Sequence, residues 1–477
     1  MKKIDKKSIT KEYRQGTKSL ILLVIIGCLF LTLGIHITVI ETMHKDDYMN
    51  HSANQRQWIT EQSVLRGSFI DRNGLILAHS ESIDNEQVRI YDFGSLYAHI
   101  IGYSSRTYGK SQLEFSYNKY LSGMSDVTDI AGNFVEEKRG DTIQLTIDND
   151  LQSMAQKMLN GKNGAVVAIK PDNGEILCMY SNPSFDPNRK SLETNWNALV
   201  ESEKSPFLSR ATSGLYAPGS VFKTIMLAAA LEQGYEDYSV YDNGTLEIGD
   251  KIFENQGKKA YGQINLKEAY MVSSNVAFMK LGVEMGPDII REYSKKFGIG
   301  LNNFQLEIPY KNGNFNYSSK LPDGEIALMS IGQGETLVTP LQMAVMTATI
   351  ANDGIYQEPH LIAKITNTIG FTVDYGNDSS SSRVIKSSTA NTIKEYMTET
   401  VERGTGTTAK IPGIIVGGKT GTAENETDGK EHTWFIGFAP AENPEIAVAV
   451  ICEYSGGSGS QNSAPIAREI IKTWLYK

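Results

Sequence analysis

The stretch LYAPGSVFKTIMLAAALEQG, residues 215–234, decides how the rest of the chain is interpreted. A proline and a glycine precede an apolar, alanine-rich run that ends at the next glycine, which predicts a helix beginning near Ser220. Positions three apart lie on the same helix face, so Ser220 and Lys223 are expected about 5–6 Å apart at their Cβ atoms.

This pairing could activate the serine without a histidine. A neutral lysine amine can remove the proton of the Ser220 hydroxyl, because burial and nearby positive charge both lower a lysine pKa. The helix N-terminus adds free N–H groups and partial positive charge, which favour a developing oxyanion. A single Ser-x-x-Lys string is more often an exposed helix start, so its interpretation depends on two further strings.

The second string is Ser273-Ser-Asn275, after the helical pattern NLKEAYMVSS. The hydroxyl of Ser273 could relay a proton towards a leaving nitrogen, and the amide of Asn275 could hold a peptide group. Alone, the string would be an ordinary polar cluster in a helix.

The third string is Lys419, Thr420, Gly421 and Thr422, after the β-branched run IPGIIVGG. It predicts a strand edge that faces a bound carboxylate, with a backbone N–H near Thr422 as an oxyanion donor. Residues 413–420 also fit the phosphate-binding pattern GxxxxGK[ST], but that motif requires a helix starting at the lysine. Because the run is strand-like and GTAENETDGKE follows it, the sequence favours a serine enzyme over a nucleotide site.

The N-terminal segment predicts a membrane anchor. Residues 20–40, LILLVIIGCLFLTLGIHITVI, carry no formal charge and would span roughly 31 Å as a helix, against a buried core helix as the alternative. Residues 1–19 have a net charge of +5, which predicts a cytoplasmic tail. The polar, bulky residues after the span predict an uncleaved signal anchor, with the rest of the protein extracytoplasmic at a bacterial cell membrane.

Composition excludes several function classes. The whole chain carries −9, so the part beyond the tail carries −14, which argues against nucleic acid as a partner. The three cysteines and seven histidines show no metal-ligand spacing, and no metal or cofactor is expected.

The remaining sequence suggests two units, a polar segment at residues 41–148 and a larger unit at residues 149–477. In the larger unit, GAVVAIKPDNGEILCMYSN predicts a β-hairpin, and helical patterns dominate from about residue 220 to residue 354. The β-rich runs VIKSSTA, IIVGG, WFIGFAP and IAVAVICEY follow, then a last helix, APIAREIIKTWLYK. We expect an α+β domain with one mostly antiparallel sheet, and surface loops at SSSSR and SGGSGSQNSAP.

The ectodomain resembles the class B, monofunctional penicillin-binding proteins over roughly residues 60–470. The resemblance rests on the three strings above and on RGSFIDRNGLILA, HIIGYSSRTYGKSQLEFSYNKYLSG, SNPSFDPN, IGQGETLVTPLQMA and WFIGFAPAENPEIAVAV. It implies a penicillin-binding/serine-β-lactamase-like transpeptidase domain on a smaller, extended pedestal domain.

The resemblance also implies an activity. The penultimate D-Ala of a peptidoglycan stem peptide would acylate Ser220, an amine of a neighbouring stem would then form the cross-link, and β-lactams would acylate the same serine. The pedestal, with Arg66 and Gly67, would contact a SEDS-family glycosyltransferase. The implied roles are base for Lys223, proton relay for Ser273 and Lys419, and substrate binding for Asn275, Thr420, Gly421 and Thr422.

Three alternatives share this machinery: a β-lactamase or β-lactam sensor, a D,D-carboxypeptidase, and a membrane-anchored cell-wall scaffold that has lost catalysis. Two departures from the family pattern also stand. The pedestal is short, about 100 residues, which leaves division, elongation and sporulation open as the pathway. The family often has Asn-Arg where this chain has Ser209-Arg210.

Overall fold

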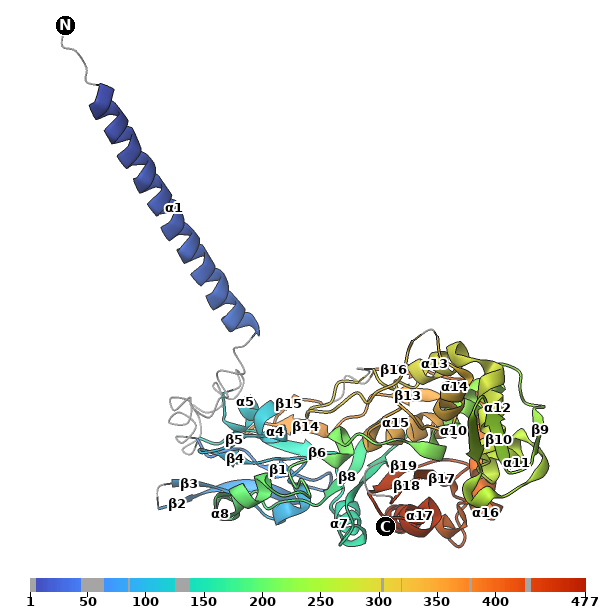
Figure 1. Ribbon diagram of the computed structural model, residues 1–477. Coiled ribbons are helices and arrows are strands. Elements are labelled where there is room, and N and C mark those ends of the chain that lie inside the picture. The colour runs from blue at the N-terminus through green and yellow to red at the C-terminus, as the bar shows by residue number, and fades with distance from the viewer. Residues whose placement is uncertain are drawn as a thin grey trace.

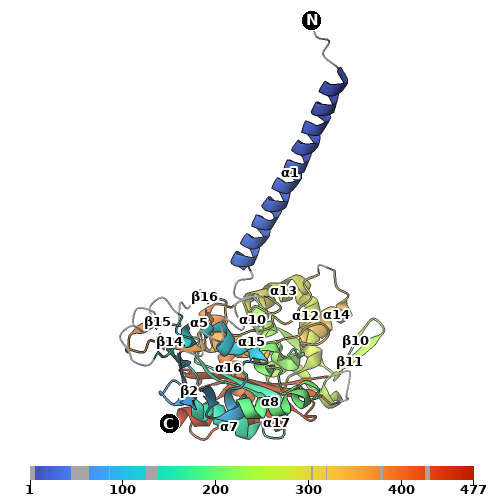
Figure 2. The ribbon, with the colours of Figure 1, turned by 90° about the vertical axis from the view of Figure 1, so that its left-hand side faces the viewer.

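The computed structural model describes residues 6–43, 64–84, 86–124, 138–301, 304–318, 320–376, 380–424 and 430–477. An N-terminal helix, α1 (Lys6–Met43), projects away from a folded body (Figures 1 and 2). Its Leu20–Met43 part has a mean hydropathy of 2.8 and no buried residues. The hydroxyl of Thr32 donates to the Cys28 carbonyl, one turn back, so its polarity is satisfied inside the helix. The helix is therefore compatible with a membrane anchor, and it is not a core helix of the body.

A five-stranded antiparallel sheet forms the centre of the larger unit, in the order β17-β18-β19-β7-β8. Its strands β7 and β19 read as continuous apolar runs and are buried along their whole length. The predicted hairpin is confirmed as the antiparallel pair β7 and β8. The strands are β7 (Gly164–Ile169), β8 (Ile176–Asn182), β17 (Gly417–Ala423), β18 (His432–Ala439) and β19 (Ile446–Cys452).

Helices α15 (Pro340–Ala351) and α17 (Gly459–Leu475) pack against this sheet, and α7 (Asn149–Met158) packs against β8 (Figure 1). A helical region lies beyond the β17 edge. It contains η3 (Gly219–Val221), α10 (Lys223–Glu232), α11 (Leu266–Met271), α12 (Asn275–Met285), α13 (Pro287–Lys296), α14 (Asp323–Ser330), α16 (Ser387–Arg403) and η5 (Thr407–Ala409). The same region carries β9 (Ser239–Asp242), β10 (Thr245–Ile248), β11 (Lys251–Glu254), η4 (Gln256–Lys258) and β12 (Gly262–Asn265), while β13 (Ile355–Gln357) pairs with β16 (Ser381–Arg383). The predicted α+β class is confirmed.

A second, six-stranded sheet lies in the N-terminal unit, in the order β15-β14-β6-β1-β2-β3. Two of its strands come from the chain after α15, so segments far apart in sequence share one sheet. The strands are β1 (Phe69–Ile70), β2 (Ile76–Ile83), β3 (Glu86–Tyr91), β6 (Thr142–Leu145), β14 (Ile362–Thr366) and β15 (Thr372–Asp374). Around it lie η1 (Gly94–Tyr97), β4 (Ser104–Ser105), β5 (Gly109–Lys110), α4 (Gln112–Ser116), α5 (Asn118–Leu121) and α8 (Arg189–Val200). Helix α9 (Arg210–Ser213) instead packs against β7 and β8 of the five-stranded sheet.

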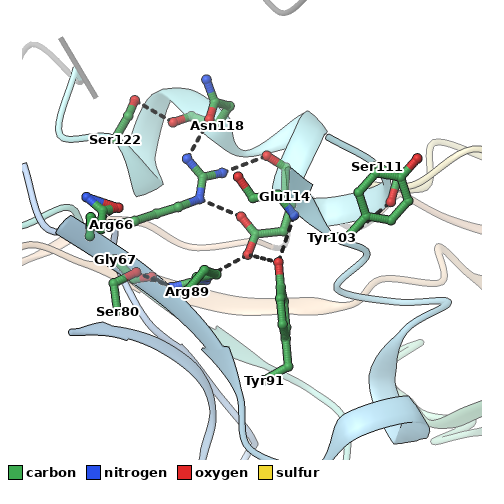
Figure 3. Close-up of polar contacts among 12 residues, drawn as sticks. Arg66, Gly67, Ser80, Arg89, Tyr91, Tyr103, Ser111, Glu114, Asn118 and Ser122 are labelled. Atoms are coloured by element: carbon green, nitrogen blue, oxygen red, sulfur yellow. Dashed lines mark hydrogen bonds and ion pairs between the residues drawn. The ribbon is translucent and has the colours of Figure 1, made fainter. Parts of the chain in front are cut away.

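A buried charge cluster joins this sheet to α4 and α5 (Figure 3). The carboxylate of Glu114 is fully buried and accepts from Arg66 Nε at 2.5 Å and from Arg89 Nε at 2.7 Å. Arg66 also donates to the Asn118 side chain at 2.6 Å, and Tyr91 donates to Glu114 at 3.2 Å. Burial by itself raises the pKa of Glu114, but the charges and hydrogen bonds of the two arginines outweigh it and hold that pKa below its usual value.

Four local expectations were wrong. IIVGG was expected as a strand, but only its two glycines belong to β17, which begins at Gly417. VIKSSTA was expected as a strand, but α16 begins at Ser387 within it; the Glu232 carboxylate of α10 accepts the N–H of Lys386 and so supports the helix start from a distance. SGGSGSQNSAP was expected as a loop, but α17 begins inside it, because Ser458 and Gln461 form a capping box. SSSSR was expected as a loop, but its last part is β16.

We predict that Glu114→Gln destabilises the full chain by about 3–5 kcal/mol, because it leaves two buried guanidinium groups without their counter-charge. Chemical denaturation in detergent at pH 7 measures the difference. Since the folded pKa of Glu114 is lowered, the wild-type advantage is full above the ordinary value of 4.5 and is lost as pH falls through the folded pKa. The gap should therefore close at acid pH.

The matched control is Glu193→Gln, because Glu193 is 43% exposed and pairs with Arg189 on the surface of α8. This change should cost less than about 0.5 kcal/mol. Equal losses in the two variants would contradict the assignment of the Glu114 cluster as a stabilising centre.

Candidate active site

Ser220 lies in η3, immediately before α10, beside strand β17. Gly219 has a φ of +55°, and a Cβ at this position would overlap the carbonyl oxygen of Thr422. The Gly219 N–H donates to the Gly332 carbonyl at 2.9 Å, which ties η3 to a third segment. The glycine therefore brings Ser220 up against β17, in agreement with the helix start expected from the sequence.

Lys223, at the first position of α10, is completely buried. Its Nζ donates to the Ser273 carbonyl and to the Asn275 side-chain oxygen, both at 2.8 Å, and lies 3.5 Å from Ser273 Oγ. Burial first, and the positive charge of Lys419 second, hold the pKa of Lys223 well below its usual value, while Asp242 acts in the opposite direction. A lysine in this environment can exist as the neutral amine.

Lys419, on β17, is also completely buried. Its Nζ donates to Ser273 Oγ at 2.8 Å and to the Thr420 carbonyl at 2.9 Å. Burial lowers the pKa of Lys419 to about 7. The Ser273 hydroxyl therefore lies between two lysine amines that come from different elements.

The Ser273–Asn275 turn has an unusual backbone. Ser273 has a φ of +61°, in the left-handed region, which costs a non-glycine residue about 1–3 kcal/mol. Ser274 caps α12 by accepting the N–H of Ala277 at 2.9 Å. The Asn275 amide donates to the Glu254 carbonyl at 3.0 Å, so the turn also contacts the end of β11.

The remaining predicted residues lie along β17, antiparallel to β18. Thr420 donates through Oγ1 to Thr405 Oγ1 at 2.7 Å. A Cβ at Gly421 would come within 3.0 Å of the Trp434 Cβ, so the glycine allows close packing there, and Thr422 is half-buried next to it. The structure thus brings all three sequence motifs to one place.

Several residues around the site were not predicted. Asp242 and Asn255 contact the Ser273–Asn275 turn from behind, and Thr405 extends the hydroxyls of β17. None belongs to a recognisable string, and a resemblance to the motifs alone gives no signal for them.

The arrangement also decides between the alternatives for the Gly-Lys-Thr string. Lys419 lies in the middle of a strand rather than at a helix start, so no phosphate-binding loop is formed. Within the described ranges, no group of three or more His, Cys, Asp or Glu side chains is placed to hold a metal ion. A serine at a helix start with two buried lysines defines a serine enzyme that works with lysine in place of histidine.

Comparison with known proteins identifies the family. Residues 164–472 match the penicillin-binding protein transpeptidase domain, and residues 66–144 match the dimerisation domain of penicillin-binding protein A. The chain belongs to the class B penicillin-binding proteins.

Individual relatives agree over nearly the whole chain. The peptidoglycan D,D-transpeptidase PbpA of Mycolicibacterium smegmatis is 32% identical, over 95% of this chain and 97% of its own. Penicillin-binding protein A of M. tuberculosis, in its acyl-enzyme complex with ceftriaxone, superposes with a TM-score of 0.82 at 30% identity, over 87% of this chain and 99% of that one. The transpeptidase domain from Eggerthella lenta gives a TM-score of 0.79 at 32% identity, over 87% and 99% of the two chains.

We predict that Gly219→Ala destabilises the protein and slows its labelling by a fluorescent penicillin, because the new methyl group meets the backbone of β17. The matched control is Gly234→Ala at the other end of α10, where φ is +84° but a Cβ has nothing within 4 Å. The control carries only backbone strain, about 1–2 kcal/mol. Gly219→Ala should lose about 1–3 kcal/mol more through overpacking.

Thermal unfolding and the rate of labelling are measured on both variants. If Gly219→Ala behaves like its control in both measurements, the close contact between η3 and β17 is not what holds Ser220 in place.

Proposed function

We propose that this protein is a peptidoglycan D,D-transpeptidase, which cross-links stem peptides through an acyl-serine intermediate and is acylated by β-lactams at the same residue. The observation that carries the proposal is the meeting of Lys223 and Lys419 at the hydroxyl of Ser273, beside the helix start with Ser220. The relatives named above are transpeptidases or β-lactam acyl-enzymes, which supports the same substrate class.

Acylation begins at Ser220. Its Oγ attacks the carbonyl carbon of the penultimate D-Ala, and the neutral amine of Lys223 takes the hydroxyl proton. The free N–H groups at the start of α10 and a backbone N–H near Thr422 stabilise the oxyanion. When the C–N bond breaks, Ser273 passes a proton to the leaving nitrogen, and Lys419 supports that hydroxyl from the other side.

The substrate is bound between the Ser273–Asn275 turn and strand β17. The Asn275 amide, fixed by Glu254 and Lys223, holds the peptide group of the donor. On β17, the hydroxyls of Thr420 and Thr422 bind the terminal carboxylate of the donor peptide. Gly421 leaves no side chain between them.

The second half of the reaction decides the enzyme's type. An amine of a neighbouring stem attacks the acyl-serine ester, forms the new amide and releases Ser220, with the proton returned through the same lysines. A carboxypeptidase would use water as the acceptor, and a β-lactamase would use water against a bound β-lactam. The match to PbpA over 95% of the chain favours the cross-linking reaction.

The proposal includes a location and a partner. The basic tail, residues 1–19, stays in the cytoplasm, residues 20–40 cross the membrane, and the catalytic body lies outside. Residues 41–148 form the pedestal, of which the structure describes residues 41–43, 64–84, 86–124 and 138–148, and residues 149–477 form the transpeptidase domain. A SEDS-family glycosyltransferase, which supplies glycan strands in the same membrane, is the proposed partner of the pedestal.

Ser220→Ala should abolish covalent labelling by a fluorescent penicillin while the thermal unfolding temperature stays nearly unchanged, because only the attacking oxygen is removed. Gel fluorescence after denaturation measures the covalent adduct. Ser213→Ala, a serine outside the site on α9, is the control and should label like the wild type. Labelling that survives in Ser220→Ala would rule out this serine as the nucleophile.

Incubation with lipid-linked glycan polymer should yield dimeric stem peptides, because the acceptor is an amine rather than water. Mass spectrometry of digested product separates dimers from trimmed monomers, and Ser220→Ala serves as the blank. Only monomeric tetrapeptide would mean that the protein is a D,D-carboxypeptidase. Neither product, together with retained β-lactam labelling, would favour a β-lactam sensor, and neither product without labelling would favour a scaffold.

A further inference from the structure

Two buried residues stand behind the Ser273–Asn275 turn. Asp242 ends strand β9 and is fully buried, and Asn255 follows β11 and is 4% exposed. The Asn255 amide donates to both carboxylate oxygens of Asp242, at 2.9 and 2.8 Å, and to the Lys259 carbonyl at 2.8 Å. The β10–β11 hairpin between them projects from the body (Figure 2).

This pair is bonded directly to the turn. The side-chain oxygen of Asn255 accepts the backbone N–H of Asn275 at 2.8 Å and of Val276 at 3.1 Å, the first two residues of α12. Asp242 accepts the hydroxyl of Ser274 at 2.6 Å. Its other oxygen accepts the Gly244 N–H at 2.8 Å, so both oxygens of the carboxylate are used.

These bonds explain why Ser273 can keep its left-handed backbone. A strained residue persists only where its surroundings over-determine it. Here the next residue along the chain, Ser274, is fixed by Asp242, and the residue after that, Asn275, is fixed by Asn255. The same turn offers the Ser273 carbonyl to Lys223 and the Ser273 hydroxyl to Lys419.

We propose that Asp242 and Asn255 are positioning residues of the acyl-transfer site: they hold the Ser273–Asn275 turn in the one conformation that meets both lysines, and the Asp242 carboxylate places a negative charge behind Lys223. The inference rests on the proposed function, because acylation is its readout. Neither residue touches the substrate, and both act through the turn.

Among the charged groups around Lys223, the Asp242 carboxylate is the one that raises the pKa of this lysine. The charges that act on Lys223 are those of Lys419, from β17, and of Asp242, from behind the turn. The ring of Tyr270 on α11 lies 5.7 Å from Lys419 Nζ. Helices α13 and α16 meet α10 at its other end, around Glu232. Asp242 raises the pKa of Lys223 against burial and Lys419, so removing its charge lowers that pKa further.

Asp242→Asn keeps the shape of the side chain but turns one acceptor into a donor that faces the Asn255 amide. The second-order rate of acylation by a fluorescent penicillin should fall roughly 100-fold, as expected when reacting groups are misplaced by about 1 Å. If Lys223 is the base, acylation rises with pH as Lys223 loses its proton. The rising limb should therefore move to lower pH in this variant, which a smaller fraction of folded protein would not produce.

Exchanging the two side chains tests the pairing itself. In Asp242→Asn combined with Asn255→Asp, the carboxylate at position 255 can accept the two N–H groups of α12 and the amide of residue 242. We expect this double variant to recover at least about tenfold over either single change, since one donor and one acceptor face each other again.

Ser274→Ala covers the case in which the charge variants do not fold. It removes only the hydroxyl that links Asp242 to the turn, and should slow acylation about tenfold. Asn265→Ala is the matched control, because Asn265 caps the neighbouring helix α11 without contacting the turn. Both changes remove an N-cap, so their unfolding temperatures should fall alike.

The outcomes distinguish the proposed function from the positioning role of Asp242 and Asn255. Absence of labelling in the wild-type protein would overturn the proposed function. Labelling at Ser220, with Ser274→Ala acylated as fast as Asn265→Ala, would overturn the positioning role alone. So would an Asp242→Asn variant that keeps both the wild-type rate and the wild-type pH profile.

Discussion

Two fully buried amines, those of Lys223 and Lys419, are the constraint on which the site depends. A buried ammonium group is costly unless acceptors surround it, and two of them close together add mutual repulsion. Here the acceptors come mainly from one short turn, because Ser273 offers its carbonyl to Lys223 and its hydroxyl to Lys419. A displaced turn would leave two lysines without acceptors, so the conformation of Ser273 and the protonation of the amines are set together.

Close backbone packing satisfies that constraint. Ser220, the Ser273–Asn275 turn and strand β17 lie far apart in the chain: Lys223 is 50 residues from Ser273, and Ser273 is 146 residues from Lys419. They meet because glycines remove side chains at the contacts: Gly219 lies against Thr422, and Gly421 lies between Trp434 and the segment before η3. The Trp434 indole then donates to the Ala217 carbonyl at 3.0 Å and fixes that segment. The five-stranded sheet therefore fixes the position of the segment that carries Ser220.

How much the sequence could predict depended on whether the signal was local. The Ser220 helix start, the β7–β8 hairpin and the three motifs rest on neighbouring residues, and the structure has each of them. The start of α16 was missed because Glu232, from another helix, supports it. Asp242 and Asn255 had no signal either, since they contact the Ser273–Asn275 turn from positions distant in sequence. The addition of β14 and β15 to the N-terminal sheet is likewise a long-range pairing.

The protonation of the two lysines links acylation to deacylation in the proposed mechanism. Burial lowers the pKa of Lys419 to about 7 and, with the charge of Lys419, holds the pKa of Lys223 well below its ordinary value, so a neutral amine is accessible in this pair. Such a pair titrates as a unit, and one proton can be shared between the amines. Because Ser273 Oγ contacts both, a proton taken from Ser220 has a short path to the leaving nitrogen, and a proton from the acceptor amine has the same path back. The negative charge of Asp242 raises the pKa of Lys223 and so opposes the loss of its proton. In the proposed mechanism Asp242 therefore affects both acylation and deacylation, although it does not contact the substrate.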